Sequence, residues 1–171
     1  MRALVALLAV VVASGCTSTP SPSLTDATAT AVPSGGIVNV AIRRLTDARP
    51  VRREAAMIGI AFDAATARTL VADPAPLDFA SEALLCLALG ERATSGWSVT
   101  IQSISLDGSR MSILAREARP RTGGPSAGPT YPADCAAIDR SVLSPGELLV
   151  RADDTISDEF IVDATIEVPA S

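Results

Sequence analysis

A strict alternation of apolar and polar side chains near the C-terminus constrains the fold more than any other feature. Apolar residues stand at every second position from Phe160 to Val168, and Asp163, Thr165 and Glu167 lie between them. A period of two is typical of a β-strand that buries one face and leaves the other in water. The segment 160–168 is therefore predicted to be a strand in a sheet with one solvated face.

Other apolar segments predict further strands and one helix. Asp63 can cap a helix over 64–72, because its short carboxylate accepts hydrogen bonds from exposed backbone N–H groups, and Asp73-Pro74 ends it. The alternation changes phase near Gln102-Ser103, which predicts a bulge, and Asp107-Gly108 predicts a hairpin turn. The further predicted strands are 37–42, 55–62, 82–89, 97–106, 111–115 and 148–150.

These segments together predict a mostly β (α+β) fold. We expect an antiparallel sheet or a small β-sandwich with one short helix, formed by a single domain over residues 37–171. Aromatic residues make up only 3% of the chain. The core is therefore expected to consist mainly of Ala, Val, Ile and Leu.

The N-terminus has the three regions of an export signal. Met1-Arg2 is followed by an unbroken apolar run over 3–13, and small residues then precede Cys16. The run is shorter than the roughly 20 residues of a transmembrane helix. The pattern predicts a lipoprotein signal peptide over 1–15 and lipidation of Cys16, which anchors the protein outside the cytoplasm at the cell membrane or the outer membrane. A plain secretory peptide with an incidental cysteine is the alternative.

Residues 16–36 consist mainly of Thr, Ser, Pro, Ala and Gly with almost no charge. This composition predicts a disordered tether between the lipid and the domain.

The charged residues exclude several functions. All basic residues are arginines, histidine is absent, and the net charge is −5. An acidic chain is not expected to bind nucleic acid. Without histidine or lysine there is no His-based general base, Ser-Lys dyad or Schiff base, and nearly all zinc sites are excluded. We therefore predict a protein that is not an enzyme and has no cofactor and no metal.

Two cysteines remain once Cys16 carries the lipid. Cys86 and Cys135 are expected to form a disulfide in an oxidising compartment. Two separate buried thiols are the alternative.

Four further segments share an order of features with a known family; they are 77–85, 89–97, 116–120 and 130–132. Together they resemble PrcB-like proteins, a family named for an accessory lipoprotein of a surface protease complex. The similarity extends over roughly residues 50–140, although Ala93, Ser95 and Trp97 depart from the family's usual Pro, Gly and Tyr. It implies a non-catalytic role in binding another protein, a protease in that family.

Two groups of residues are candidates for partner binding. Thr94, Ser95, Gly96 and Trp97 could form a binding edge, where Gly96 lets a peptide backbone approach and Trp97 offers a flat surface. Alternatively Trp97 fills the core, which is the interpretation favoured by the apolar residues two and four positions later.

The other group is cationic and consists of Arg116, Arg119 and Arg121, which could dock an acidic partner or simply belong to a solvated loop. A group of acidic residues has calcium-binding chemistry but lacks an EF-hand spacing, and an ordinary solvated segment is the preferred interpretation. That group is Asp153, Asp154, Asp158 and Glu159.

The sequence thus predicts a surface-anchored lipoprotein that binds and stabilises another extracytoplasmic protein, a protease complex if the resemblance holds. A lipoprotein that binds a small ligand or an envelope component is the competing hypothesis. A hydrolase is a third and disfavoured one, because no pair of carboxylates stands out by its spacing.

Overall fold

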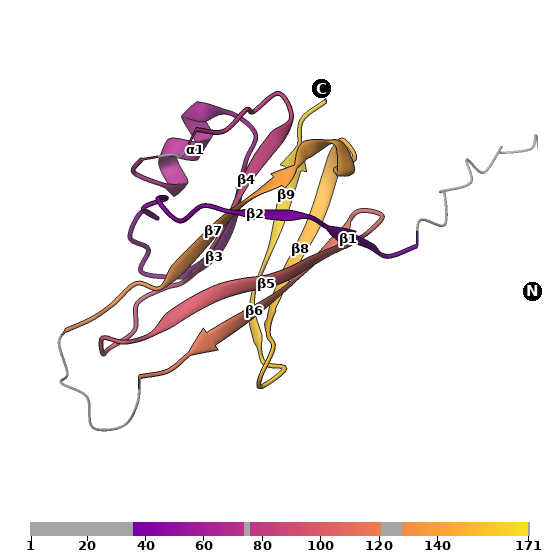
Figure 1. Ribbon diagram of the computed structural model, residues 1–171. Coiled ribbons are helices and arrows are strands. Elements are labelled where there is room, and N and C mark those ends of the chain that lie inside the picture. The colour runs from indigo at the N-terminus through magenta and orange to yellow at the C-terminus, as the bar shows by residue number, and fades with distance from the viewer. Residues whose placement is uncertain (1–35, 74–75, 121–127, 171) are drawn as a thin grey trace, which may run out of the picture. The chain divides into compact units, whose positions relative to one another are not determined.

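The computed structural model describes residues 36–73, 76–120 and 128–170. The predicted signal peptide, Cys16, nearly all of the predicted tether and Arg121 lie outside these ranges. The described chain forms two β-sheets, a helix α1 (Ala64–Leu70) and a short 3-10 helix η1 (Arg140–Val142) (Figure 1). This confirms the mostly β fold with one short helix. Within the described ranges, no helix has the length and apolar character needed to cross a membrane.

The first sheet has five strands in the order β1-β5-β6-β8-β9. Neighbouring strands are antiparallel except for β6 and β8, which run parallel. This parallel pair arises because the chain passes through the second sheet between the two strands (Figure 1). The strands are β1 (Val38–Val40), β5 (Ser98–Asp107), β6 (Arg110–Ala118), β8 (Gly146–Asp154) and β9 (Phe160–Val168).

The second sheet has four antiparallel strands in the order β2-β7-β4-β3. The predicted strand 37–42 contributes to both sheets, because the chain leaves β1 at Ala41 and enters β2 directly. The strands are β2 (Ile42–Arg44), β7 (Ala133–Asp139), β4 (Glu82–Leu89) and β3 (Ala56–Ala61).

Strand β4 shows why one segment of the chain is apolar at nearly every position. Leu85 and Leu87 face the core between the two sheets, whereas Leu84 and Cys86 face a second core beneath α1. A strand covered on both faces has no solvated position and therefore shows no alternation. The largest fully buried side chains are Leu84, Leu85, Leu87, Leu89, Ile101, Ile104, Met111, Ile113, Ile138, Val71 and Val150.

The second core contains the predicted disulfide. Cys86 in β4 and Cys135 in β7 are directly opposed in the sheet, and their sulfur atoms are bonded at 2.11 Å. Both cysteines are buried beneath α1. The bond therefore links the two central strands of the four-stranded sheet.

Several local predictions are confirmed. The register between β5 and β6 shifts between Ile101 and Ser103, as a bulge requires, and the two strands are joined by a tight turn after Asp107. Asp63 caps α1 by accepting a hydrogen bond from the backbone N–H of Thr66 at 2.8 Å.

Other boundaries differ from the prediction. The helix α1 ends at Leu70, because Val71 adopts an extended conformation and pairs with Pro50. The predicted strand 148–150 extends over the whole of β8, and β7 was not predicted.

Candidate functional site

One end of the sandwich carries an open hollow of about 490 Å³ that contains the chain's one tryptophan. We call it the Trp97 hollow. It lies where β3 and β9 begin and where β4 and β8 end, so that its walls come from both sheets. Its lining residues are Ala56, Leu89, Arg92, Trp97, Glu117, Arg119, Asp154, Glu159, Phe160 and Ile161.

The preferred interpretation of Trp97 as a core residue is wrong. Strand β5 begins only at Ser98, and Trp97 is half-buried and belongs to neither hydrophobic core. Its indole Nε1 donates to Oγ1 of Thr94 at 3.2 Å. The alternation of Val99 and Ile101 does not extend back to Trp97, because β5 begins at Ser98 and Trp97 directly follows Gly96, whose φ of +90° lies outside the strand conformation.

Gly96 has a close neighbour in its own chain. A Cβ atom at this position would lie 3.0 Å from Cβ of Pro120. Pro120 of the same chain therefore lies close to Gly96. The close approach of these residues packs the turn 94–97 against the segment that follows β6.

Two arginines accompany the Trp97 ring. The guanidinium carbons of Arg92 and Arg119 lie 5.4 Å and 5.6 Å from the ring centroid, within the range of cation–π attraction. Arg92 also lies 3.6 Å from a carboxylate oxygen of Glu117, and Arg119 lies 3.8 Å from one of Glu159. The hollow thus combines an aromatic surface with two arginines and two glutamates.

The structure divides the predicted cationic group. Arg119 reaches the Trp97 hollow. Arg116 lies within β6, and its exposed side chain alternates with buried ones, so that it stands with Ser112 and Leu114 on the solvated face of the five-stranded sheet. Because Arg121 lies outside the described residues, only one of the three arginines is placed at the hollow.

Asp154 holds the hairpin between β8 and β9 in place. It is only 6% exposed, and its Oδ1 accepts a hydrogen bond from the backbone N–H of Glu117 at 2.9 Å. Its Oδ2 accepts from the backbone N–H of Ile156 and from both the N–H and the hydroxyl of Ser157. The N–H of Glu117 and these further donors hold the pKa of Asp154 below its ordinary value.

The predicted acidic group is dispersed over different interactions. Asp153 binds Arg151, Asp154 is occupied by backbone and hydroxyl donors, and Glu159 faces Arg119. Across 36–73, 76–120 and 128–170, no three Asp, Glu, Cys or His side chains are placed to hold a metal ion.

Sequence reasoning did not identify Arg92 or Phe160 as site residues. Phe160 was assigned to the buried face of β9, but the register between β8 and β9 shifts after Ala152 and leaves this ring 53% exposed. Arg92 is placed by a two-way backbone pairing with Thr130. No local pattern marks that pairing.

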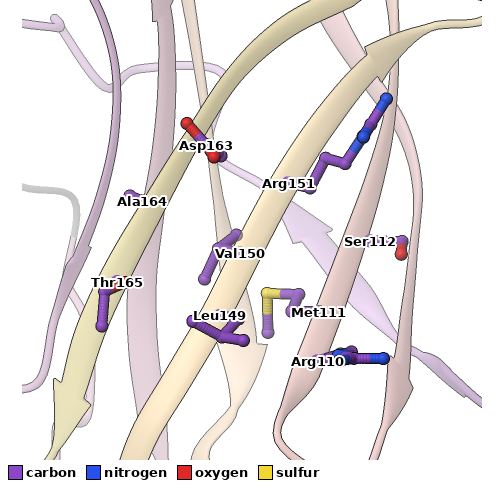
Figure 2. A pocket seen from close by; sticks show the side chains of 9 residues that line it. All are labelled: Arg110, Met111, Ser112, Leu149, Val150, Arg151, Asp163, Ala164 and Thr165. Atoms are coloured by element: carbon purple, nitrogen blue, oxygen red, sulfur yellow. The ribbon is translucent and has the colours of Figure 1, made fainter.

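A second concavity of about 440 Å³ lies over β6, β8 and β9 on the solvated face of the five-stranded sheet (Figure 2). Figure 2 shows Arg110, Arg151 and Asp163 around it. Arg151 is bound by both carboxylate oxygens of Asp153 at 2.9 and 3.0 Å. The residues that line this concavity include no aromatic side chain. The Trp97 hollow is therefore the stronger candidate site.

No protein-family model, curated protein or solved structure matches this chain. The resemblance to PrcB-like proteins stays a prediction.

Proposed function

We propose that this protein is a lipid-anchored, extracytoplasmic binding module that docks and stabilises another protein at the Trp97 hollow and performs no chemistry itself. The observation that carries this proposal is a half-buried tryptophan beside two guanidinium groups at an open end of the sandwich. Trp and Arg dominate the binding energy of protein interfaces, because they combine a large contact area with directed donors.

The anchor in this proposal is a lipid on Cys16. It is supported by the apolar run and the small residues that precede this cysteine. Acyl chains hold a protein at a membrane in proportion to their buried methylenes, by about 0.8 kcal/mol each. A tethered module of this kind is suited to a partner at the same membrane, and the resemblance to PrcB-like proteins favours a protease.

The carboxylates in the hollow favour binding over hydrolysis. A general acid needs a raised pKa, but hydrogen bonds lower the pKa of Asp154. Both of its oxygens are already occupied by protein donors. Glu117 and Glu159 each face an arginine.

A small polar ligand is the second candidate. The volume of the hollow, about 490 Å³, falls within the range of about 300–1,000 Å³ that is typical of ligand pockets. Its open form and its charged walls suit a protein segment better than an apolar molecule.

The test is purification of the lipidated protein from its native membrane in mild detergent, with mass spectrometry of co-purifying proteins. We expect a stoichiometric partner with the wild-type protein and with Arg110→Ala, whose side chain stands on the solvated sheet face, and loss of that partner with Trp97→Ala. A partner retained in full by Trp97→Ala would place the docking surface elsewhere. A wild-type preparation without any partner would favour the small-ligand function.

A further inference from the structure

The arginines of the Trp97 hollow are paired less closely with carboxylates than Arg43 and Arg151 are. Arg44, which lies 3.6 Å from Asp134, is similar to them in this respect. Arg43 and Arg151 each bind a carboxylate through hydrogen bonds of 2.8–3.0 Å. The closest carboxylate oxygens of Arg92 and Arg119 lie at 3.6 and 3.8 Å, beyond hydrogen-bond length. A guanidinium carries five N–H donors arranged to fit a carboxylate. Among the described residues, no carboxylate lies within hydrogen-bond distance of Arg92 or Arg119.

Glu159 is an exposed and loosely held anion beside this site. Its side chain is 70% exposed, and that of Arg119 is 67% exposed. Exposed ion pairs of this kind contribute little to stability. An external carboxylate can therefore replace Glu159 beside Arg119 without disturbing the fold.

An apolar surface adjoins the two guanidinium groups. Phe160 follows Glu159 directly and leaves half of its ring in water. The partly buried Ile161 lies beside it in the lining of the hollow. Burying such exposed apolar area adds about 25 cal/mol per Å² to binding. The hollow therefore offers a cationic position next to an apolar one.

We propose that the hollow recognises an acidic residue followed by an aromatic or aliphatic residue in an extended segment of the partner. The carboxylate of that acidic residue binds the guanidinium groups of Arg119 and Arg92 and displaces Glu159. The apolar side chain that follows it packs against Phe160 and Trp97. The chain's own Glu159-Phe160 pair has the same order of chemistry at the rim. This inference rests on the proposed function for the place of docking.

The test uses the fluorescence of Trp97, which is the only tryptophan and therefore reports on the hollow alone. The full-length protein in detergent micelles is titrated with the blocked peptide acetyl-Gly-Glu-Phe-Gly-amide and with its Gln counterpart. We expect the Glu peptide to change the emission and the Gln peptide to bind about tenfold more weakly, because a charge-assisted hydrogen bond is lost.

Two variants are expected to change the affinity for the Glu peptide in opposite directions. Arg119→Gln weakens binding of the Glu peptide about tenfold, because it removes the cation. Glu159→Gln strengthens binding about threefold, because it removes the competing internal carboxylate. Arg110→Gln, on the sheet face shown in Figure 2, leaves the affinity unchanged.

Equal affinity for the two peptides, absence of binding to either, or weaker binding to Glu159→Gln would each overturn the acidic-segment proposal. None of these results tests the proposed function itself. That function is tested separately by the loss of the native partner in Trp97→Ala.

Discussion

Asp154 shows how one residue can connect the fold to the site. Of the charged side chains in the described ranges, this one is buried, and the chain supplies a donor to each of its oxygens. Those donors come from β6 and from the turn that carries Glu159 and Phe160. Asp154 therefore positions the rim of the Trp97 hollow without facing a ligand itself.

Asp154→Ala is expected to lower the free energy of unfolding by about 2–3 kcal/mol, because it leaves buried backbone donors unsatisfied. The neighbouring Asp153→Ala is the control. It removes an ion pair with the largely exposed Arg151 and should cost less than about 1 kcal/mol. Urea unfolding of the two variants measures the difference. Equal costs would contradict the anchoring role of Asp154.

The stability should also depend on pH through this residue. The pKa of Asp154 lies below its ordinary value of 3.8 in the folded state. The ionised group therefore stabilises the fold above about pH 4, and this contribution is lost as the pH falls through the folded-state pKa. Between pH 5 and pH 3 the wild type should lose more stability than Asp154→Asn. The pKa values of Asp63 and Asp139 are lowered too, so the variant retains part of the acid sensitivity.

At the site, the sequence identified Trp97 and Arg119 as candidates but assigned the tryptophan to the core. The error has a local cause, since the apolar period of Val99 and Ile101 was extended back past Ser98, the first residue of β5, to Trp97. Arg92 and Asp154 could not be assigned their roles, because these depend on contacts with Thr130 and Glu117 that are distant in sequence.

At the scale of elements, strands were predictable where they alternate or where they form a long run of large apolar residues, as β4 does. Strand β9 and the hairpin β5–β6 were predicted because each has one wet face and therefore alternates. Strand β7 was missed because it is covered on both faces and built from small residues such as Ala136 and Ala137, which give no periodic signal. The parallel pairing of β6 and β8 was not predicted either. Alternation in the sequence indicates that a segment is a strand, but it does not indicate which strand lies beside it.

The edge of β5 is protected by side chains from the other sheet. Strand β1 pairs with β5 only from Ile104 to Leu106. Beyond it, the backbone N–H of Ile101 donates to Asp134 at 2.8 Å, and Arg44 donates to the Ile101 carbonyl at 2.8 Å. Side chains that occupy an edge in this way prevent pairing with another chain.

Asp134→Ala should therefore speed hydrogen exchange at the Ile101 amide and increase light scattering during unfolding, because the edge is uncovered. Asp139→Ala is the control on the same strand, since Asp139 caps η1 instead. Unchanged exchange at Ile101 in Asp134→Ala would refute the edge-protection account.

The disulfide between β4 and β7 is expected to contribute strongly to the free energy of unfolding. It joins β4 and β7 across a sequence separation of 49 residues. Replacing Cys86 and Cys135 together by Ala should lower the free energy of unfolding by about 4 kcal/mol, mainly by freeing the unfolded chain. Guanidinium unfolding measures this loss. A variant as stable as the wild type would show that native packing alone holds the two strands together.

For the whole molecule, we propose a lipid at Cys16, a tether and a sandwich that carries the Trp97 hollow at one end. The sandwich is stabilised by two cores and a disulfide, which keep the residues of the hollow in fixed positions. In this proposal the tether confines that hollow to the neighbourhood of the membrane, which would raise the effective concentration of a membrane-bound partner.

The most direct test of this account is site-specific photo-crosslinking in intact cells. A photoreactive residue replaces Ile156, which is exposed in the hairpin beside the hollow, or Arg68, which is exposed on α1. The account predicts a covalent adduct with one extracytoplasmic protein from position 156, its loss when Trp97→Ala is added, and no such adduct from position 68. An adduct from position 68 alone, or one from position 156 that persists with Trp97→Ala, would contradict docking at the Trp97 hollow.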